Sequence, residues 1–161
     1  MLDEFVSRAL SEDLGDGDHT SLACINEHEK SAARLEVRER GILAGIGVAK
    51  RVFELYDTSL EIEILKNDGD SVIEGDIAFI VKGSARSILS TERLVLNLMQ
   101  RMSGIATKTH QMLEMISHTD AILLDTRKTT PGMRFIEKEA VAIGGGGTVS
   151  YTHLTLPTIR E

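Results

Sequence analysis

Apolar residues recur every three or four positions at the start of the chain, which places them on one face of a helix. This pattern predicts an amphipathic helix ending near Leu14, followed by a polar loop that is rich in glycine and aspartate and continues through His19 to Ser21. Alternating apolar and charged residues then predict two half-buried strands, at 33–38 and 60–64, with a short helix over 48–56 between them. The run 77–82 is apolar at successive positions, which indicates a central strand.

The second half of the chain changes to a strand–loop–helix order. An apolar stripe over 87–117 predicts a long helix, with 103–104 (Ser-Gly) as a point of interruption or kinking. The wholly apolar run 121–124 is typical of a parallel strand covered on both faces. Pro131 marks the start of a further helix that runs to about Ile143, where four glycines end it. This order favours an α+β domain followed by the start of an α/β barrel or sheet.

Length and composition narrow the classes of protein that fit. The 161 residues suit one domain, or a small domain with part of another, and the net charge of −7 argues against a dedicated nucleic-acid binder. We predict no membrane span, because no apolar run approaches the roughly 18 residues that one requires. The N-terminus does not resemble a secretory signal. The single cysteine, Cys24, cannot form an internal disulfide, so we expect a reducing cytoplasm.

The segment 125–134 holds the most informative chemistry. Three cations, Arg127, Lys128 and Arg134, and several threonines follow the carboxyl end of the predicted parallel strand, the edge at which α/β folds bind ligands. Arginine forks match carboxylates and phosphates, and lysine adds a point charge. The segment therefore predicts a site for a polyanionic substrate, and the alternative is a solvated loop with ordinary surface charges.

Other candidate features point to structure rather than to chemistry. Taken alone, Glu92 and Arg93 are typical of an exposed helical pair. The aspartates at 13–18 lack the glycine and the terminal glutamate of a calcium-binding loop, and the five histidines show no zinc spacing. We therefore predict no metal ligands in this chain, and we interpret Cys24 as an inert thiol.

The C-terminal segment 148–161 does not continue the preceding pattern. It has no helical period, and 149–158 resembles the translation of a transposase sequencing adapter. We therefore interpret 148–161 as a non-native tail that does not pack, and exclude it from the fold. The alternative is a natural strand and turn ending at Pro157.

Five segments of the chain are similar to one known family. They begin at Glu12, Glu92, Arg101, Asp125 and Lys138, and they read Glu-Asp-Leu-Gly-Asp-Gly-Asp-His-Thr-Ser, Glu-Arg-Leu-Val-Leu-Asn, Arg-Met-Ser-Gly-Ile-Ala-Thr, Asp-Thr-Arg-Lys-Thr-Thr-Pro-Gly-Met-Arg and Lys-Glu-Ala-Val-Ala-Ile-Gly-Gly-Gly. In this order they resemble nicotinate-nucleotide pyrophosphorylase, also called quinolinate phosphoribosyltransferase. The resemblance covers 1–147 without a gap.

The resemblance implies a fold, a reaction and roles for four residues. The fold is an N-terminal α/β sandwich followed by an incomplete α/β barrel. The reaction joins quinolinate to phosphoribosyl pyrophosphate with Mg²⁺, and gives nicotinate mononucleotide, pyrophosphate and CO₂ in NAD biosynthesis. Thr126, Arg127 and Lys128 are implied to bind quinolinate and phosphates, with Lys128 as the catalytic candidate. Arg93 is implied to bind substrate in the active site of the partner subunit of a homodimer.

The sequence departs from the family after the glycines. The family continues with Asn-His-Arg, whereas Thr148 stands at the asparagine position here and the adapter-like tail follows. We therefore expect a sandwich domain with its connecting helix over 1–117, the start of the barrel over 118–147, and an inactive fragment whose Mg²⁺ ligands belong to the missing half. Two alternatives are a molybdenum-transport-type relative and a short, non-catalytic interaction domain.

Overall fold

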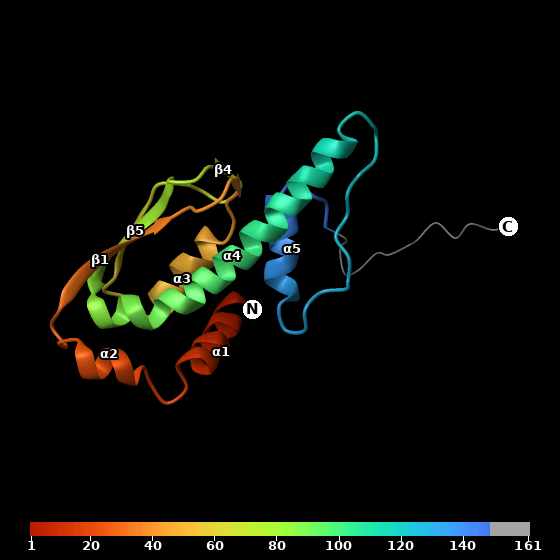
Figure 1. Ribbon diagram of the computed structural model, residues 1–161. Helices are drawn as coiled ribbons and strands as arrows, with labels where there is room; N and C mark the ends of the chain where they lie inside the picture. Colours follow the sequence, from red (N-terminus) through yellow and green to blue (C-terminus); the bar gives the residue numbers. More distant parts are fainter. Residues whose placement is uncertain (149–161) are drawn as a thin grey trace.

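The structure is a computed structural model that describes residues 1–148 (Figure 1). The helices are α1 (Leu2–Leu14), α2 (His19–Cys24), α3 (Ile46–Tyr56), α4 (Ala85–Ile116) and α5 (Arg134–Ile143). The strands are β1 (Lys30–Glu36), β2 (Gly41–Ile42), β3 (Glu61–Ile64), β4 (Ser71–Val72) and β5 (Ile77–Ser84). The expectations for 149–161 lie outside the described residues.

The main sheet has β5 in the centre, as its apolar sequence predicted. Its strand order is β1-β5-β3 with antiparallel pairing on both sides, so that Ala33 lies opposite Val81 and Ile62 opposite the same residue. The short strands β2 and β4 form a second antiparallel pair. β1 is more exposed than a half-buried strand, because it lies at the edge of the sheet and only its last two residues are partly covered.

Helices α3 and α4 cover the main sheet and form the core with it. The Phe53 ring of α3 meets the Phe79 ring of β5 edge to face, with centroids 5.8 Å apart. Met102 of α4 is among the most buried side chains, at 1% exposure. α1 packs against both α3 and α4. The first part of the chain is therefore an α+β layer arrangement.

Helix α4 runs through Ser103 and Gly104 without the predicted interruption. The hydroxyl of Ser103 bonds to the backbone of Ala44 in both directions, at 2.9 and 3.1 Å, and Thr107 Oγ1 accepts the N–H of Ile42 at 2.8 Å. These hydroxyls bind the β2 segment rather than disturbing their own helix. The Ser-Gly pair at 103–104, which suggested a break in the helix, is therefore explained by a contact between α4 and the segment around Ala44.

The polar segment after α1 is not entirely a loop. Residues 19–24 form α2, because the Asp18 carboxylate caps the helix by accepting the Ser21 N–H at 3.1 Å. The prediction of a loop through Ser21 was therefore wrong. Although an aspartate caps it, a helix of only six residues is too short to show a periodic apolar pattern.

The start of the second domain differs from the sequence prediction in two places. Helix α5 begins at Arg134, and Pro131 lies in a turn before it. The run 121–124 is not a buried strand, since Ile122 is 77% exposed and Leu124 is 52% exposed. One parallel bridge joins Leu124 to Gly147 on the far side of α5. The two segments are therefore parallel, as in a β-α-β unit, but neither is a strand, and within residues 1–148 no element covers both faces of the run.

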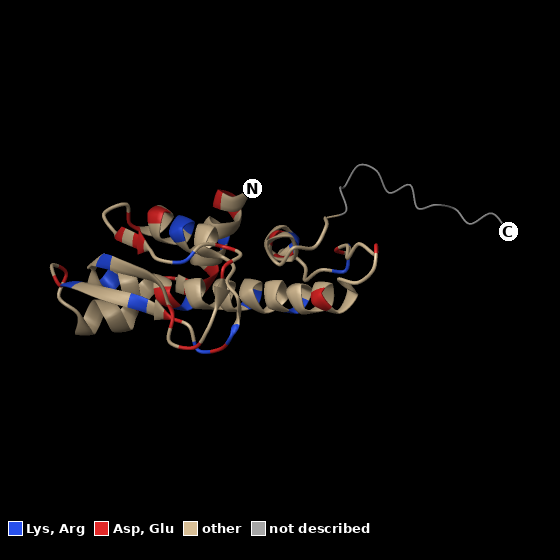
Figure 2. Cartoon of the chain, turned by 90° about the horizontal axis from the view of Figure 1, so that it is seen from above, with Lys and Arg blue, Asp and Glu red and all other residues tan. Residues whose placement is uncertain are grey.

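Helix α4 joins the two parts of the molecule. Figure 1 shows the sheet and α3 beside its first half and α5 beside its second half. Figure 2 shows that the loop preceding α5 lies at the same end of α4 as α5 does. Within the described residues, we find no helix that is long and apolar enough to cross a membrane.

Candidate active site

The predicted anion-binding segment is an exposed loop between residue 124 and α5. Thr126, Arg127 and Lys128 are all exposed, and the Lys128 N–H donates to Thr126 Oγ1 at 3.1 Å, which shapes the loop into a local turn. The loop borders a cavity of about 290 Å³ that also contacts α4 and α5. The structure therefore brings three of the four predicted site residues together.

One face of α5 is turned toward this loop. Arg134, Glu137 and Lys138 have i, i+3, i+4 spacing, so their side chains project from the same side of the helix. Arg134 Nε donates to Thr129 Oγ1 at 3.2 Å, and its Nη2 donates to the Arg127 carbonyl at 3.4 Å. The third cation of the segment thus binds the loop itself in addition to adding positive charge beside it.

Lys138 and Asp125 form a buried ion pair at the start of the loop. The Lys138 Nζ lies 2.6 Å from Asp125 Oδ1, and the two side chains are only 9% and 3% exposed. Thr148 Oγ1 donates to the second Asp125 oxygen at 2.8 Å, and the Asp125 N–H donates to the Gly147 carbonyl at 3.0 Å. These contacts hold the end of the 121–125 segment against the residues that follow α5.

Glu137 holds the other end of the loop. Its Oε2 accepts the Thr130 N–H at 3.1 Å, and its Oε1 accepts from Arg101 Nε of α4 at 2.9 Å. Arg101 also donates to the Thr130 hydroxyl. Burial by itself raises the pKa of the Glu137 carboxyl, but the hydrogen bonds from Arg101 and Thr130 outweigh it, so the pKa lies below its usual value.

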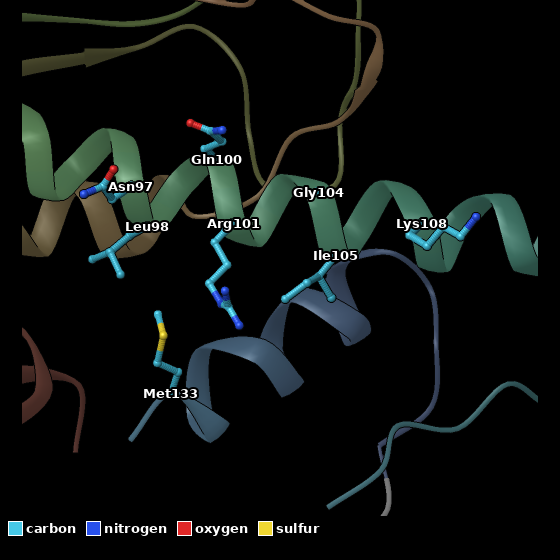
Figure 3. A pocket seen from close by; sticks show the side chains of 8 residues that line it. All are labelled: Asn97, Leu98, Gln100, Arg101, Gly104, Ile105, Lys108 and Met133. Carbon is cyan, nitrogen blue, oxygen red and sulfur yellow. The ribbon is translucent and has the colours of Figure 1, made fainter. Parts of the chain in front are cut away.

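Arg101 reaches the loop across a hollow of about 720 Å³ on the surface of α4. Figure 3 shows its side chain extending from α4 toward the start of α5, with Met133 beside it. The Arg101 side chain is 41% exposed, whereas the side chain of Glu137, which it contacts, is 11% exposed. The pair therefore lies at the boundary between solvent and the contact of the two helices.

Arg93 does not lie with the loop of its own chain. It is on α4 eight residues before Arg101, which corresponds to about 12 Å along the helix. Its side chain is 68% exposed and forms an ion pair at 2.9 Å with Asp13, in the last turn of α1. The fourth predicted site residue therefore contacts α1, and no hydrogen bond or ion pair within residues 1–148 joins it to the other three.

The described residues do not offer a site that fits Mg²⁺. Residues 1–148 contain no group of three or more His, Cys, Asp or Glu side chains arranged to hold a metal ion. The aspartates at 13–18 have other roles, since Asp18 caps α2 and Asp13 pairs with Arg93. We accordingly derive no chemical step through a metal.

Sequence reasoning missed Arg101, Glu137 and Lys138. A charged residue on an amphipathic helix, such as Arg101, is usually a solvated surface group. In the sequence, Glu137 and Lys138 likewise look like an exposed pair of opposite charges. Their i+3 and i+4 spacing from Arg134 was the available signal, because it places three charges on one face next to a cation-rich loop. Burial of that face could be seen only in the structure.

The carboxyl of Glu139, also on α5, lies in surroundings that disfavour its charged form. Its Oε2 is buried with no hydrogen-bond partner among the described residues, and burial, together with the charge of Asp68, raises its pKa. Asp68 itself accepts the N–H groups of Gly45, Ile46 and Gly47 at the start of α3. Glu139 therefore faces a fixed negative charge at the contact between α5 and the first domain.

We predict that Glu139→Gln raises the free energy of unfolding at pH 7. Because the pKa is higher in the folded than in the unfolded chain, the charged carboxyl disfavours folding above the folded pKa, and this penalty disappears as the pH falls through it. The gain from the substitution should therefore shrink between pH 7 and pH 4. Urea unfolding at several pH values measures it, with the exposed Glu74→Gln as the control. A gain that grows on acidification would contradict the prediction.

Comparison with known proteins identifies relatives along most of the chain. The family model described as "Quinolinate phosphoribosyl transferase, N-terminal domain" matches residues 18–103, and the corresponding C-terminal domain matches 105–155. A Nicotiana tabacum quinolinate phosphoribosyltransferase [decarboxylating] is 48% identical over 146 residues, which are 90% of this chain and 41% of the relative. A probable nicotinate-nucleotide pyrophosphorylase [carboxylating] of Bacillus subtilis is 39% identical, over 91% of this chain and 50% of the relative.

Solved structures that resemble this chain carry the name of the same enzyme family. The crystal structure of NadC from Streptococcus pyogenes superposes with a TM-score of 0.88 at 38% identity, and the match covers 92% of this chain and 53% of that one. The chain thus spans about half the length of the proteins that it matches.

Proposed function

We propose, from the membership of this chain in the quinolinate phosphoribosyltransferase family, that it acts in the transfer of a phosphoribosyl group to quinolinate. Phosphoribosyl pyrophosphate is the donor, and the products are nicotinate mononucleotide, pyrophosphate and CO₂. The observation that carries the proposal is the exposed loop 126–128. Its two cations have no ion-pair partner among residues 1–148, while the loop around them is hydrogen-bonded in place. The names of the relatives do not favour the molybdenum-transport alternative.

The loop has the charge that such substrates require. Quinolinate carries two carboxylates, and the donor carries several phosphates. We assign Arg127 to a bidentate carboxylate or phosphate contact, Lys128 to a point-charge contact at the reacting centre, and Thr126 to a hydroxyl contact. We assign the exposed Arg93 to the substrate site of a partner subunit in a homodimer, because no hydrogen bond or ion pair within residues 1–148 brings it to the loop.

The chemistry needs positioning and charge stabilisation more than a nucleophile from the protein. The pyridine nitrogen attacks the ribose carbon as the bond to pyrophosphate breaks, through a transition state with oxocarbenium character. The carboxylate beside the nitrogen then leaves as CO₂, and its electron pair stays on the ring carbon until a proton is added. The ammonium of Lys128 and the guanidinium of Arg127 lower the energy of that electron-rich ring.

Three further assignments belong to the same proposal. The family resemblance implies Mg²⁺, and we assign its ligands to the half of the relatives that this chain does not match. We keep 1–117 and 118–147 as the two domains. We expect the protein in the cytoplasm, whereas the names of some plant relatives place those proteins in mitochondria or chloroplasts.

We predict that the chain makes no nicotinate mononucleotide alone, but does so when completed. Residues 1–147 joined to the C-terminal half of the Bacillus subtilis relative should form product from quinolinate and phosphoribosyl pyrophosphate, because the relative supplies the half that the chain does not match. Turnover measured by the release of pyrophosphate and ¹⁴CO₂ tests this, with the same hybrid carrying Lys128→Ala as the control.

A hybrid that folds and dimerises but releases neither product would overturn the proposed function. Turnover by the 161-residue chain at the rate of the hybrid would instead contradict the assignment of activity to the completed protein. Release of pyrophosphate without CO₂ would point to the phosphoribosylation of a different acceptor.

A further inference from the structure

The loop that carries the candidate substrate contacts is anchored at its beginning, middle and end by one face of α5. Lys138 binds Asp125 at the beginning, and Arg134 binds the Arg127 carbonyl and Thr129 in the middle. Glu137 binds the Thr130 N–H at the end. Between these anchors the side chains of residues 126–128 remain exposed.

The anchor at Glu137 differs from the other two because a second helix completes it. Arg101 of α4 donates to both Glu137 and Thr130, so one guanidinium contacts the helix and the loop at once. The Glu137 carboxylate accepts from both partners and is nearly buried, at 11% exposure. The end of the loop is therefore tied to α4, which packs against α5 and also carries Arg93.

An anchored loop matters for an anion site. Arg127, Lys128 and Arg134 repel one another, and an unconstrained loop would separate their charges and sample many backbone conformations. The carboxylates of Asp125 and Glu137 offset part of this repulsion without occupying the exposed cations. A loop held before the ligand arrives loses less conformational freedom on binding, which increases affinity.

We propose that Arg101 and Glu137 are positioning residues that hold the 126–129 loop in its ligand-binding conformation. They act through Thr130 and need not contact the substrate. The choice of quinolinate as the ligand rests on the proposed function, whereas the effect on the loop does not.

The test uses the 161-residue chain and compares Arg101→Gln with Lys108→Gln. Lys108 is also an exposed cation of α4, but it has no contact with the loop among the described residues. Solvent exchange of the Lys128 amide, measured by NMR, reports the loop, since neither substituted side chain touches that amide. The Leu43 amide, which bonds to Asp70 in the first domain, reports global stability.

We expect Arg101→Gln to increase exchange at Lys128 by about tenfold, as for the loss of one charge-assisted contact, with Leu43 unchanged. Lys108→Gln should leave both amides unchanged. Arg101→Lys, which can still reach Glu137, should restore much of the protection. Because Arg101→Gln leaves Glu137 unpaired and can destabilise the chain, the double variant Arg101→Gln/Glu137→Gln provides an uncharged pair that should show the same selective increase at Lys128.

Titration of the same variants with quinolinate separates the two proposals. Both the proposed function and the positioning role are supported if the wild type binds quinolinate and the affinity falls about tenfold in Arg101→Gln but not in Lys108→Gln. No binding by the wild type, with exchange at Lys128 still selectively raised, removes quinolinate as the ligand of this chain and leaves the positioning role supported. Unchanged exchange at Lys128, or a parallel rise at Lys128 and Leu43, would overturn the positioning role.

Discussion

Arg127→Ala and Lys128→Ala should each weaken quinolinate binding by at least about tenfold in the completed hybrid enzyme. Each removes a proposed charge-assisted contact, which would be worth roughly 1.5–3 kcal/mol, and 1.4 kcal/mol corresponds to a factor of ten. Both side chains are exposed, and within residues 1–148 neither side chain forms a hydrogen bond, so their loss should leave the fold intact. Removing the two together should cost about a hundredfold or more if the contacts are independent.

Isothermal titration with quinolinate measures this, and Arg40→Ala is the matched control. Arg40 is an exposed arginine next to β2, outside the loop. Conservative changes sharpen the test, since Arg127→Lys keeps the charge but loses the bidentate geometry and should recover only part of the affinity. Affinities equal to that of the control would show that the loop does not bind this substrate.

Mixing an Arg93→Ala hybrid with an Arg127→Ala hybrid should restore activity that neither has alone. Arg93 is exposed and pairs with Asp13 of α1, and within residues 1–148 it has no hydrogen bond or ion pair with the loop of its own chain. If Arg93 serves the partner's site, a mixed dimer has one site with both defects and one with neither. Up to half of the activity per mixed dimer should therefore return.

Turnover of mixed dimers, isolated with two different affinity tags, measures the recovery. Arg93→Ala mixed with itself is the control and should stay at background. A mixed dimer without activity would mean that Arg93 acts in its own subunit or not at the site. The Asp13→Asn variant adds a second comparison, because it removes the ion pair that holds Arg93 in this structure without removing the arginine. Asp13→Asn alone should keep far more activity than Arg93→Ala.

Local chemistry in the sequence was sufficient to predict most elements and the loop. Residues 2–14 show a helical period because one face of α1 is apolar, and β5 shows a continuous apolar run because it lies in the centre of the sheet. The local pattern alone therefore predicts both elements. The cation-rich segment was recognisable because Arg127 and Lys128 stand next to a strand-like run and before a helix. Family resemblance then predicted the fold class, which the comparisons confirm.

Tertiary contacts decided the rest. Ser103 and Gly104 do not break α4, because the Ser103 hydroxyl binds the backbone of Ala44 from a segment about sixty residues earlier. The run 121–124 is exposed although its sequence is typical of a buried strand, since burial depends on neighbours that a local pattern cannot specify. Arg101 and Glu137 form an anchor only because α4 and α5 pack together. The sequence by itself determined which residues could bind an anion, and the packing of α4 against α5 decided how the loop that carries them is held.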